Sequence, residues 1–285
     1  MSDDLKLVKE LRDKTGAGFL DCKEALAKNE GNLDNAIDYL RKKGLAKASK
    51  KSSREANEGA VGFFENKNIG VLIKVNSETD FAAKDANFLS FGEKVKEYIS
   101  KNKIFEASVL KESSLEDDRK ALVQTIGENI QIRRVVTLEF DSTMNIGIYI
   151  HPDSKLGSLV VTKDGSDEIA KDIAMHVSAF NPLCLSQDDI DKDVLEREKA
   201  IYQNQAQDSG KPQDIMDKMV DGKIKRFLSE VSLISQNFVK DPDITVQEYL
   251  EKGGATIVEF ARLKVGEGIE VETKDFAEEV AEQLK

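Results

Sequence analysis

Tryptophan is absent from this chain, and cysteine, histidine and proline are scarce, at two, two and four among 285 residues. Cys22 and Cys184 lie far apart and in no Cys/His pattern with zinc spacing, so we expect reduced structural thiols and no metal site. No window approaches the ~20 apolar residues of a membrane-spanning helix, and the N-terminus has no basic start followed by an apolar stretch. We therefore expect a cytoplasmic protein without membrane contact.

Motifs of the common enzyme classes are also missing. No H-E-x-x-H, G-x-S-x-G or G-x-x-x-x-G-K-[ST] occurs, which excludes the usual zinc, acyl-transfer and P-loop sites. Gly16-Ala17-Gly18 opens a dinucleotide fingerprint, but Asp21 stands at its third glycine position and a helical pattern precedes it. No carboxylate pair lies in an apolar context that would raise a pKa. We expect no enzyme activity and no cofactor.

Charge is abundant and mostly negative. The chain has 53 acidic and 42 basic residues, for a formal net charge of −11, so phosphate backbones should repel it and direct nucleic-acid binding is disfavoured. One segment differs: residues 41–54 hold seven basic side chains and no acid. It is either a hydrated connector or a surface that docks on an acidic partner. An RNA-binding factor and a degenerate enzyme are the competing function classes.

The length predicts about two domains, and hydrophobic periodicity divides the chain further. Residues 5–44 hold three short helical stripes, with Asn32 as an N-cap and Gly44 as the stop of the third helix. Strands are then predicted at 59–64, 69–75 and 132–140, around helices whose apolar stripes run over 88–99 and 122–130. Ser114-x-x-Asp117 should cap the second of these helices.

A similar order of elements recurs in the second half. Strands are predicted at 146–150, 156–161 and 256–265, with a helix over 169–177. Residues 186–230 read as two polar helices broken at 210–212, an antiparallel hairpin whose start Ser186-x-x-Asp189 caps and whose apolar stripe packs mainly on itself. A short helix is expected at 275–284. The fold class is α+β with two antiparallel sheets.

Several segments are similar to signature stretches of the elongation factor Ts family. The matching stretches, in chain order, are TGAGFLDCKEAL at 15–26, NSETDFAAKD at 76–85, IGENI at 126–130 with Arg133-Arg134, AMHV at 174–177, GKP at 210–212 and FARLKVGEGIE at 260–270. The resemblance implies a ubiquitin-associated-like (UBA-like) domain with a basic linker over 1–54 and core subdomains over 55–140 and 141–265. A coiled-coil hairpin at 186–230 interrupts the second subdomain, and a C-terminal helical module occupies 266–285.

The resemblance also implies a function. Members of this family bind elongation factor Tu in its GDP-bound and nucleotide-free forms and promote GDP release by disturbing the Mg²⁺/phosphate site, so that GTP can bind. No covalent chemistry is needed, in agreement with the missing motifs. Homodimerisation is left open.

The segment after the 69–75 strand is the candidate wedge. Polar residues 76–79 predict an exposed turn, and small Ala82 and Ala83 leave room for Phe81 to enter a groove of the partner. Packing of Phe81 into its own core is the alternative that the residues alone leave open. The resemblance implies insertion beside the partner's magnesium ion, with Asp80 in an electrostatic role; the residues so implied are Thr79, Asp80, Phe81, Ala82, Ala83 and Lys84.

A second set of contacts is implied for the N-terminal helices. Arg12, Phe19, Leu20 and Lys23 match family positions that contact the GTPase domain, and adjacent Phe19 and Leu20 cannot both face one helix core. Further contacts are carried over to His151, Phe238 and Phe276. Ala82 stands where the family usually has Val, Asp85 where Asn is frequent, and Asn237 where Pro is common. His176, among apolar neighbours in a helix, is expected to be structural.

Overall fold

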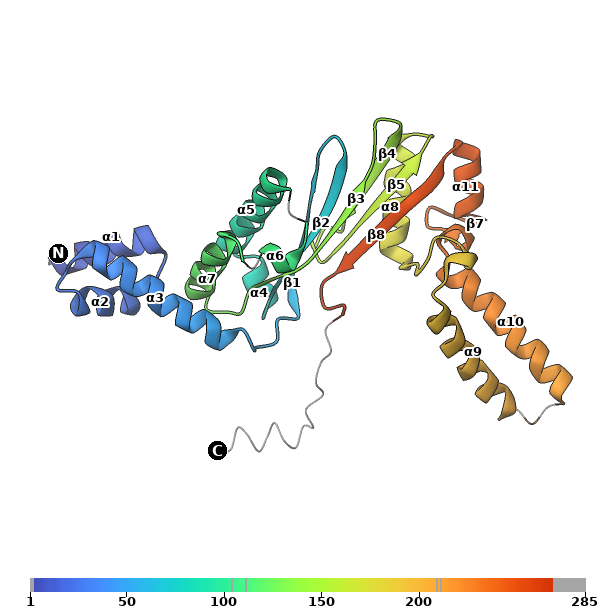
Figure 1. Cartoon of the computed structure of the whole chain (residues 1–285), viewed down its shortest axis with the longest axis horizontal. Helices are drawn as coiled ribbons and strands as arrows, with labels where there is room; N and C mark the ends of the chain where they lie inside the picture. Colours follow the sequence, from blue (N-terminus) through green and yellow to red (C-terminus); the bar gives the residue numbers. More distant parts are fainter. Residues whose placement is uncertain (1–2, 104, 111, 209, 211, 269–285) are drawn as a thin grey trace.

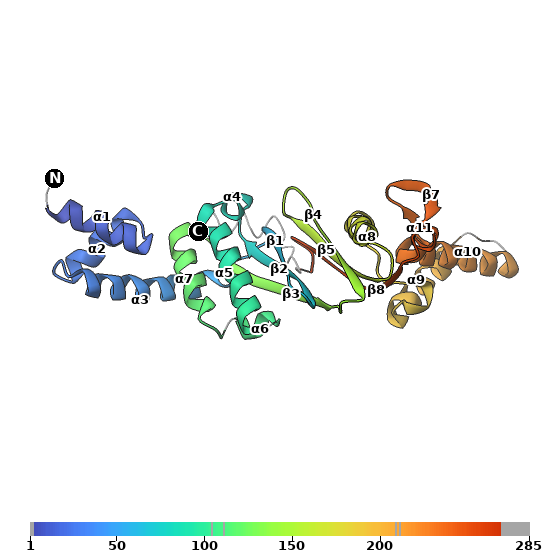
Figure 2. The same cartoon turned by 90° about the horizontal axis from the view of Figure 1, so that it is seen from above.

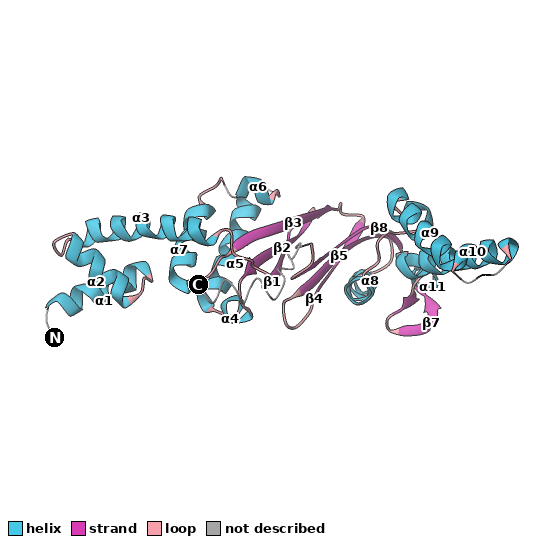
Figure 3. Cartoon of the chain, turned by 90° about the horizontal axis from the view of Figure 1, so that it is seen from below, coloured by secondary structure: helices cyan, strands magenta, loops and turns pink. Residues whose placement is uncertain are grey.

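The computed structural model describes residues 3–103, 105–110, 112–208, 210 and 212–268. The molecule is elongated, with a three-helix unit at one end, two sheets in the middle and a pair of helices projecting at the other end (Figure 1). The long strands lie in the middle and helices dominate both ends, with a short two-stranded sheet beside the helices of one end (Figure 3). The expected α+β class with antiparallel sheets is confirmed.

The middle of the molecule consists of four layers, helices on sheet on sheet on helix (Figure 2). One apolar cluster lies between α5 (Ala86–Asn102), α7 (Leu115–Ile126) and the first sheet, and another between the second sheet and α8 (Asp167–Phe180). A third cluster joins the two sheets face to face through Leu72, Leu138 and Leu159, among others. Because burial of apolar area drives the packing, these three interfaces hold the four layers together.

The three-helix unit follows the predicted periodicity. α1 spans Asp3–Thr15, α2 Phe19–Lys28 and α3 Leu33–Lys51. Its core contains Leu11, Leu26 and Leu40, and Asn32 caps α3 by accepting from the Asn35 N–H at 3.0 Å, as expected.

The predicted stop at Gly44 is wrong, because α3 continues for seven more residues to Lys51. Gly44 instead lets α3 approach α7, where a Cβ atom would collide with the Gln124 side chain. Leu40 packs in the core of the three-helix unit and Ala48 in the core of the first sheet. α3 is therefore shared by both parts and does not end at Gly44.

The basic segment 41–54 lies mostly in α3, and several of its side chains have partners within the chain. Arg41 forms an ion pair with Asp117 at 2.6 Å, Lys43 with Asp21 at 2.9 Å, and Arg54 with Glu78 at 3.5 Å. The Lys51 ammonium donates to the Gly127 carbonyl at the end of α7. These four basic side chains therefore tie α3 and the residues just after it to their neighbours, while Lys42 and Lys50 are exposed.

The first sheet has the order β1-β2-β3, with β1 at Glu58–Glu65, β2 at Ile69–Ser77 and β3 at Gln131–Glu139. All three predicted strands are confirmed to within two residues at either end. α6 (Ala107–Leu110) adds a short turn before α7. The predicted cap of α7 is wrong, because Ser114 has helical angles and its side chain makes no cap bond, while the Ser113 hydroxyl accepts from Leu115 N–H at 3.2 Å.

The second sheet has the order β4-β5-β8, with β4 at Met144–Ile150, β5 at Leu156–Lys163 and β8 at Thr256–Lys264. The β6 (Asn237–Phe238) and β7 (Asp241–Thr245) pair and α11 (Val246–Gly253) precede β8. His176 on α8 is fully buried, as expected for a structural histidine. Its Nε2 lies 2.9 Å from Gln236 Oε1, and its Nδ1 accepts from Val239 N–H at 3.1 Å.

The helical hairpin consists of α9 (Lys192–Gln207) and α10 (Gln213–Val231), which run antiparallel and project beyond the second sheet (Figure 1). Ser186 and Asp189 form a capping box as predicted, but around the short η1 helix (Gln187–Asp189), while Asp191 caps α9. Ala206 and Val220 are buried between the two helices and Ile215 stays exposed. The apolar stripe therefore packs on itself only in part.

Two features are absent from the part of the chain that the structure describes, a membrane-spanning helix and a metal-binding cluster. That part contains no helix long and apolar enough to cross a bilayer, and no group of three or more His, Cys, Asp or Glu side chains suited to a metal ion. Cys22 and Cys184 are free thiols and both are buried. The helix expected at 275–284 lies outside the described residues.

Candidate interaction site

The turn after β2 presents one aromatic side chain to solvent. Phe81, in the single-turn helix α4 (Asp80–Ala83), is 82% exposed, the highest exposure among the large hydrophobic side chains described. Ala82 and Ala83 are buried, so they anchor the turn to the core. Thr79 begins the helix by accepting from Ala82 N–H at 3.2 Å. The Phe81 ring therefore projects into solvent from a turn whose Ala82 and Ala83 are packed against the core.

The loop that follows α7 holds the start of this turn. Glu128 accepts hydrogen bonds from the Thr79 N–H at 2.9 Å and from the Thr79 hydroxyl at 2.7 Å. In the opposite direction, Glu78 accepts from the Asn129 N–H at 2.6 Å. Two carboxylates thus join segments about 50 residues apart in sequence with charge-assisted hydrogen bonds, which are stronger than neutral ones.

The electrostatics of the turn come from both halves of the molecule. Lys84 donates to Asp80 at 2.8 Å across one helical turn, and this bond lowers the pKa of Asp80 below its ordinary value. Lys155, from the loop between β4 and β5, pairs with Glu58 at 2.6 Å and also lowers the pKa of Asp80 through its charge. Asp80 is therefore ionised at neutral pH, and the turn presents a carboxylate beside an exposed ring.

The N-terminal residues form a separate surface. Phe19 and Leu20, at the start of α2, are 45% and 78% exposed, so the structure leaves both rather than one facing solvent. Arg12 and Lys23 are exposed as well. This surface and the Phe81 turn lie apart along the long axis of the molecule (Figures 1 and 2). A partner that touches both must be large.

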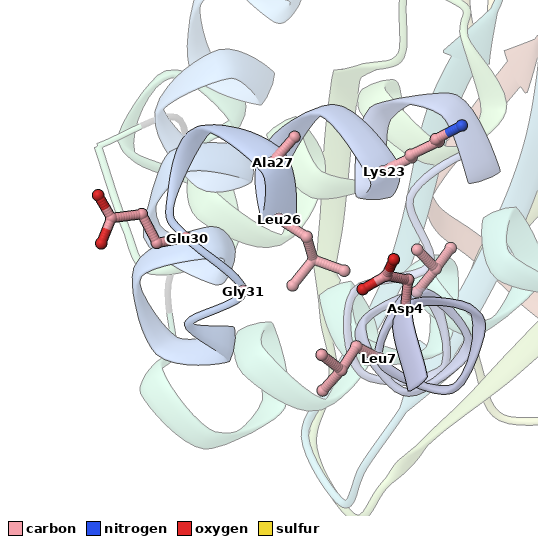
Figure 4. A pocket seen from close by; sticks show the side chains of 8 residues that line it. Asp4, Leu7, Lys23, Leu26, Ala27, Glu30 and Gly31 are labelled. Carbon is pink, nitrogen blue, oxygen red and sulfur yellow. The ribbon is translucent and has the colours of Figure 1, made fainter. Parts of the chain in front are cut away.

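A groove of about 500 Å³ runs beside this surface, between α1 and α2. Leu7 and Leu26 point into it, and Asp4 and Lys23 lie at its rim (Figure 4). Glu30 points away from the gap (Figure 4). An apolar floor with charged edges suits a protein side chain better than a reactive small molecule.

The remaining expected contacts have different surroundings. His151 is exposed, and its Nδ1 lies 2.8 Å from Asp153 Oδ1. Phe238 is only 2% exposed and stacks on Tyr249, with ring centroids 4.1 Å apart, so its ring belongs to the core of the second half and offers no face to a partner. Phe276 lies outside the described residues.

Sequence reasoning did not assign a role to Glu78, Glu128 or Asn129. Their contacts span about 50 residues and follow from the way α7 packs on the first sheet, so no local spacing announces them. The signal in the sequence was that Glu78 lies in NSETDFAAKD at 76–85 and the other two in IGENI at 126–130, both among the stretches that resemble the family.

Comparison with known proteins identifies the family. The family model described as "Elongation factor TS" matches residues 78–267. The elongation factor Ts of Hahella chejuensis is 48% identical over 281 residues, which cover 98% of this chain and 97% of that protein. This chain belongs to the elongation factor Ts family.

Other members of the elongation factor Ts family have a similar identity to this chain over nearly their full length. That of Alcanivorax borkumensis is 47% identical, over 98% of this chain and all of its own length, and that of Teredinibacter turnerae is 45% identical over 100% and 98%. The family model begins at Glu78 and therefore includes the whole Phe81 turn. The similarity to the relatives also covers the N-terminal surface.

Proposed function

We propose that this chain binds elongation factor Tu in its GDP-bound and nucleotide-free forms and accelerates release of GDP, so that GTP can bind. Membership of the elongation factor Ts family supports the partner and the process. The Phe81 turn is the element that acts on the Mg²⁺/phosphate site. No bond is made or broken, so the protein is an exchange factor and not an enzyme.

The mechanism follows from linkage. A protein that binds the nucleotide-free partner more tightly than the GDP-bound partner must weaken GDP binding by the same factor. Each ~1.4 kcal/mol of such coupling lowers the nucleotide affinity about tenfold. Mg²⁺ is a sensitive target, because its octahedral shell at ~2.0–2.1 Å tolerates little displacement. A small shift of one supporting element of the partner therefore has a large effect.

The observation that carries the proposal is the exposure of Phe81. A benzyl group left 82% exposed gains free energy only when another molecule covers it, by about 1.5–3 kcal/mol. Its neighbours in the turn are held by the core, so the ring can push against a partner without the backbone giving way. Asp80 beside it places a negative charge near an ion-binding site.

The test is release of a fluorescent GDP analogue from elongation factor Tu. Phe81→Ala should slow the stimulated release about 10- to 100-fold, the factor that corresponds to the lost burial of the ring. Phe63→Ala is the matched control, because Phe63 is also exposed but lies on β1 away from the turn. Full acceleration by Phe81→Ala would refute the proposed function.

The N-terminal surface is proposed to dock on the GTPase domain of the partner through Arg12, Phe19, Leu20 and Lys23. Leu20→Asp should raise the dissociation constant for elongation factor Tu about tenfold or more, since an apolar anchor becomes a charge. Leu89→Asp, a comparably exposed site on α5, is the control and should leave affinity unchanged. Equal affinity of Leu20→Asp and the parent chain would remove this docking role. A point substitution is preferable to deletion of 1–54, which would also remove Ala48 from the core.

The finer assignments belong to the same proposal. We propose that the three-helix unit is UBA-like, that α9 and α10 form a coiled coil, and that the domains follow the boundaries 1–54, 55–140, 141–265 and 266–285. His151 is proposed as a further contact, and the protein is proposed to work in the cytoplasm. Light scattering of the purified chain would decide between monomer and homodimer.

A further inference from the structure

We infer that Glu128 is a positioning residue that holds the Phe81 turn in the shape needed for nucleotide release. The inference rests on the proposed function and deepens it. Glu128 holds the turn through its hydrogen bonds to Thr79, which lies two residues before Phe81. Its proposed role is therefore indirect and does not require contact with the partner.

The contact is bidentate and saturates the first residue of the turn. One carboxylate oxygen of Glu128 accepts the Thr79 N–H at 2.9 Å and the other accepts the Thr79 hydroxyl at 2.7 Å. The same hydroxyl oxygen accepts the Ala82 N–H at 3.2 Å, which starts α4. The Ser77 hydroxyl donates to the Thr79 carbonyl at 2.8 Å. The N–H, the carbonyl and the side chain of Thr79 are therefore all engaged.

The loop that carries Glu128 is itself fixed from the other side. Asn129 is fully buried, its N–H donates to Glu78 at 2.6 Å, and its side-chain amide donates to the Arg54 carbonyl at 2.7 Å. The Lys51 ammonium donates to the Gly127 carbonyl. The loop at 127–129 is thus a rigid support between the end of α3 and the turn.

A rigid turn matters for Phe81 because its ring is exposed to solvent before the partner binds. Holding the turn in one geometry removes much of the ordering entropy that insertion would otherwise cost. If the turn could bend back, contact with the partner would displace the turn. The ion site of the partner would then stay in place. Glu128 should therefore affect the maximal rate of release more than affinity, which depends on many other contacts.

The chain offers a control at a related Glu–Thr contact. Glu248 accepts the Thr245 N–H at 2.7 Å and the Thr245 hydroxyl at 3.1 Å at the start of α11, both on its Oε2, whereas Glu128 uses one oxygen for each donor. Glu248→Gln and Glu128→Gln make the same substitution, but only Glu128→Gln must turn an amide group toward a threonine donor, because a glutamine at 248 can keep its single oxygen on both Thr245 donors. Only the second variant touches the Phe81 turn.

The first measurement needs no partner. Because the sequence has no tryptophan, Phe81→Trp places the protein's single indole on the turn, and it can be excited selectively over the five tyrosines. In this background, Glu128→Gln should lower the fluorescence anisotropy of the indole, and Glu248→Gln should not. Thr79→Val should act like Glu128→Gln, and Thr79→Ser, which keeps the hydroxyl, should restore the anisotropy. Unchanged anisotropy in both Glu128→Gln and Thr79→Val would overturn the inference, and the threonine pair keeps it testable if Glu128→Gln does not fold.

The second measurement is a titration of stimulated GDP release with elongation factor Tu. Glu128→Gln should lower the maximal rate about tenfold, equivalent to ~1.4 kcal/mol, with the half-saturating concentration changed less than twofold. Equal rates for Glu128→Gln and Glu248→Gln, or a rise in half-saturating concentration alone, would overturn the inference. Phe81→Ala run in parallel separates the two failures: if it keeps full acceleration, the proposed function fails, whereas the anisotropy still reports whether Glu128 holds the turn.

Discussion

The two sheets have the same strand order and the same connection from the central strand into a helix, yet they present different side chains at that connection. In the first half, β2 leads to Thr79, which caps α4 with φ −123° and ψ 160°. In the second half, β5 leads to Ser166, which caps α8 with φ −126° and ψ 160°. Both caps are followed by aspartate, and the next residue is Phe81 in one half and Glu168 in the other.

This difference means that the proposed interaction depends on a side chain and not on a backbone shape. The same capped start of a helix presents an aromatic ring to solvent in the first half and a carboxylate, which water solvates well, in the second. The helix that follows also differs, because α4 ends after four residues whereas α8 runs for 14. The first half therefore sets its ring on a short turn fixed by Glu128, and the second half continues into its core.

Exchanging the two side chains is the sharpest way to break the comparison. Phe81→Glu should lower the acceleration of GDP release about 100-fold, because the apolar contact is lost and a charge must be desolvated. Glu168→Phe should leave release unchanged. Stopped-flow fluorescence with elongation factor Tu would measure both. Loss of acceleration in Glu168→Phe would show that the two halves share the task.

The buried histidine should make the second half more sensitive to acid than the first. Burial lowers the pKa of His176, and the hydrogen bond to Gln236 opposes this only in part. Gln236 donates its amide to the Glu230 carbonyl at 2.7 Å, so its oxygen faces Nε2–H, while Nδ1 must stay unprotonated to accept from Val239. A proton on Nδ1 would break that bond.

The sign of the pH effect follows. Because the folded pKa lies below the unfolded value of 6.5, the unfolded chain binds more protons in the window between the two, and stability falls as pH drops through it. Thermal melts followed by circular dichroism should show this fall, and His176→Ala should weaken it while costing about 1–3 kcal/mol for the unpaired groups. With only two histidines in the sequence, NMR titration assigns the group. Titration of His176 above 6.5 would contradict the prediction.

The smallest effect is expected where the three-helix unit meets the first half. The Arg41–Asp117 ion pair is 2.6 Å long, but its side chains are 65% and 56% exposed. Arg41→Ala should therefore lower the free energy of unfolding by only ~0.2–1 kcal/mol, less in high salt. Denaturation with urea at two salt concentrations checks this. A larger loss of unfolding free energy would mean that the basic segment stabilises this junction more than the packing of Ala48 does.

Much of the fold was predictable because its signals are local. Period-two runs located the six long strands to within about two residues, and Asn32 was found as a cap from its position alone. Gly44 and Ser114 were misassigned because their conformations depend on α3 packing against α7 and on a competing serine. Phe238 was carried over by resemblance as a partner contact, whereas it is buried and stacks on Tyr249.

By itself, the sequence determined the α+β class, the helical hairpin, the lack of common catalytic motifs and the position of Phe81 just after a strand. Tertiary structure alone decided that Phe81 faces solvent, that Arg41, Lys43 and Arg54 form ion pairs within the chain, and that Glu128 meets Thr79. The physical reason is the difference in sequence range between the interactions involved. Turns and amphipathic periods are set by neighbours a few residues apart, whereas exposure and charge pairing depend on which distant surfaces come together when apolar area is buried.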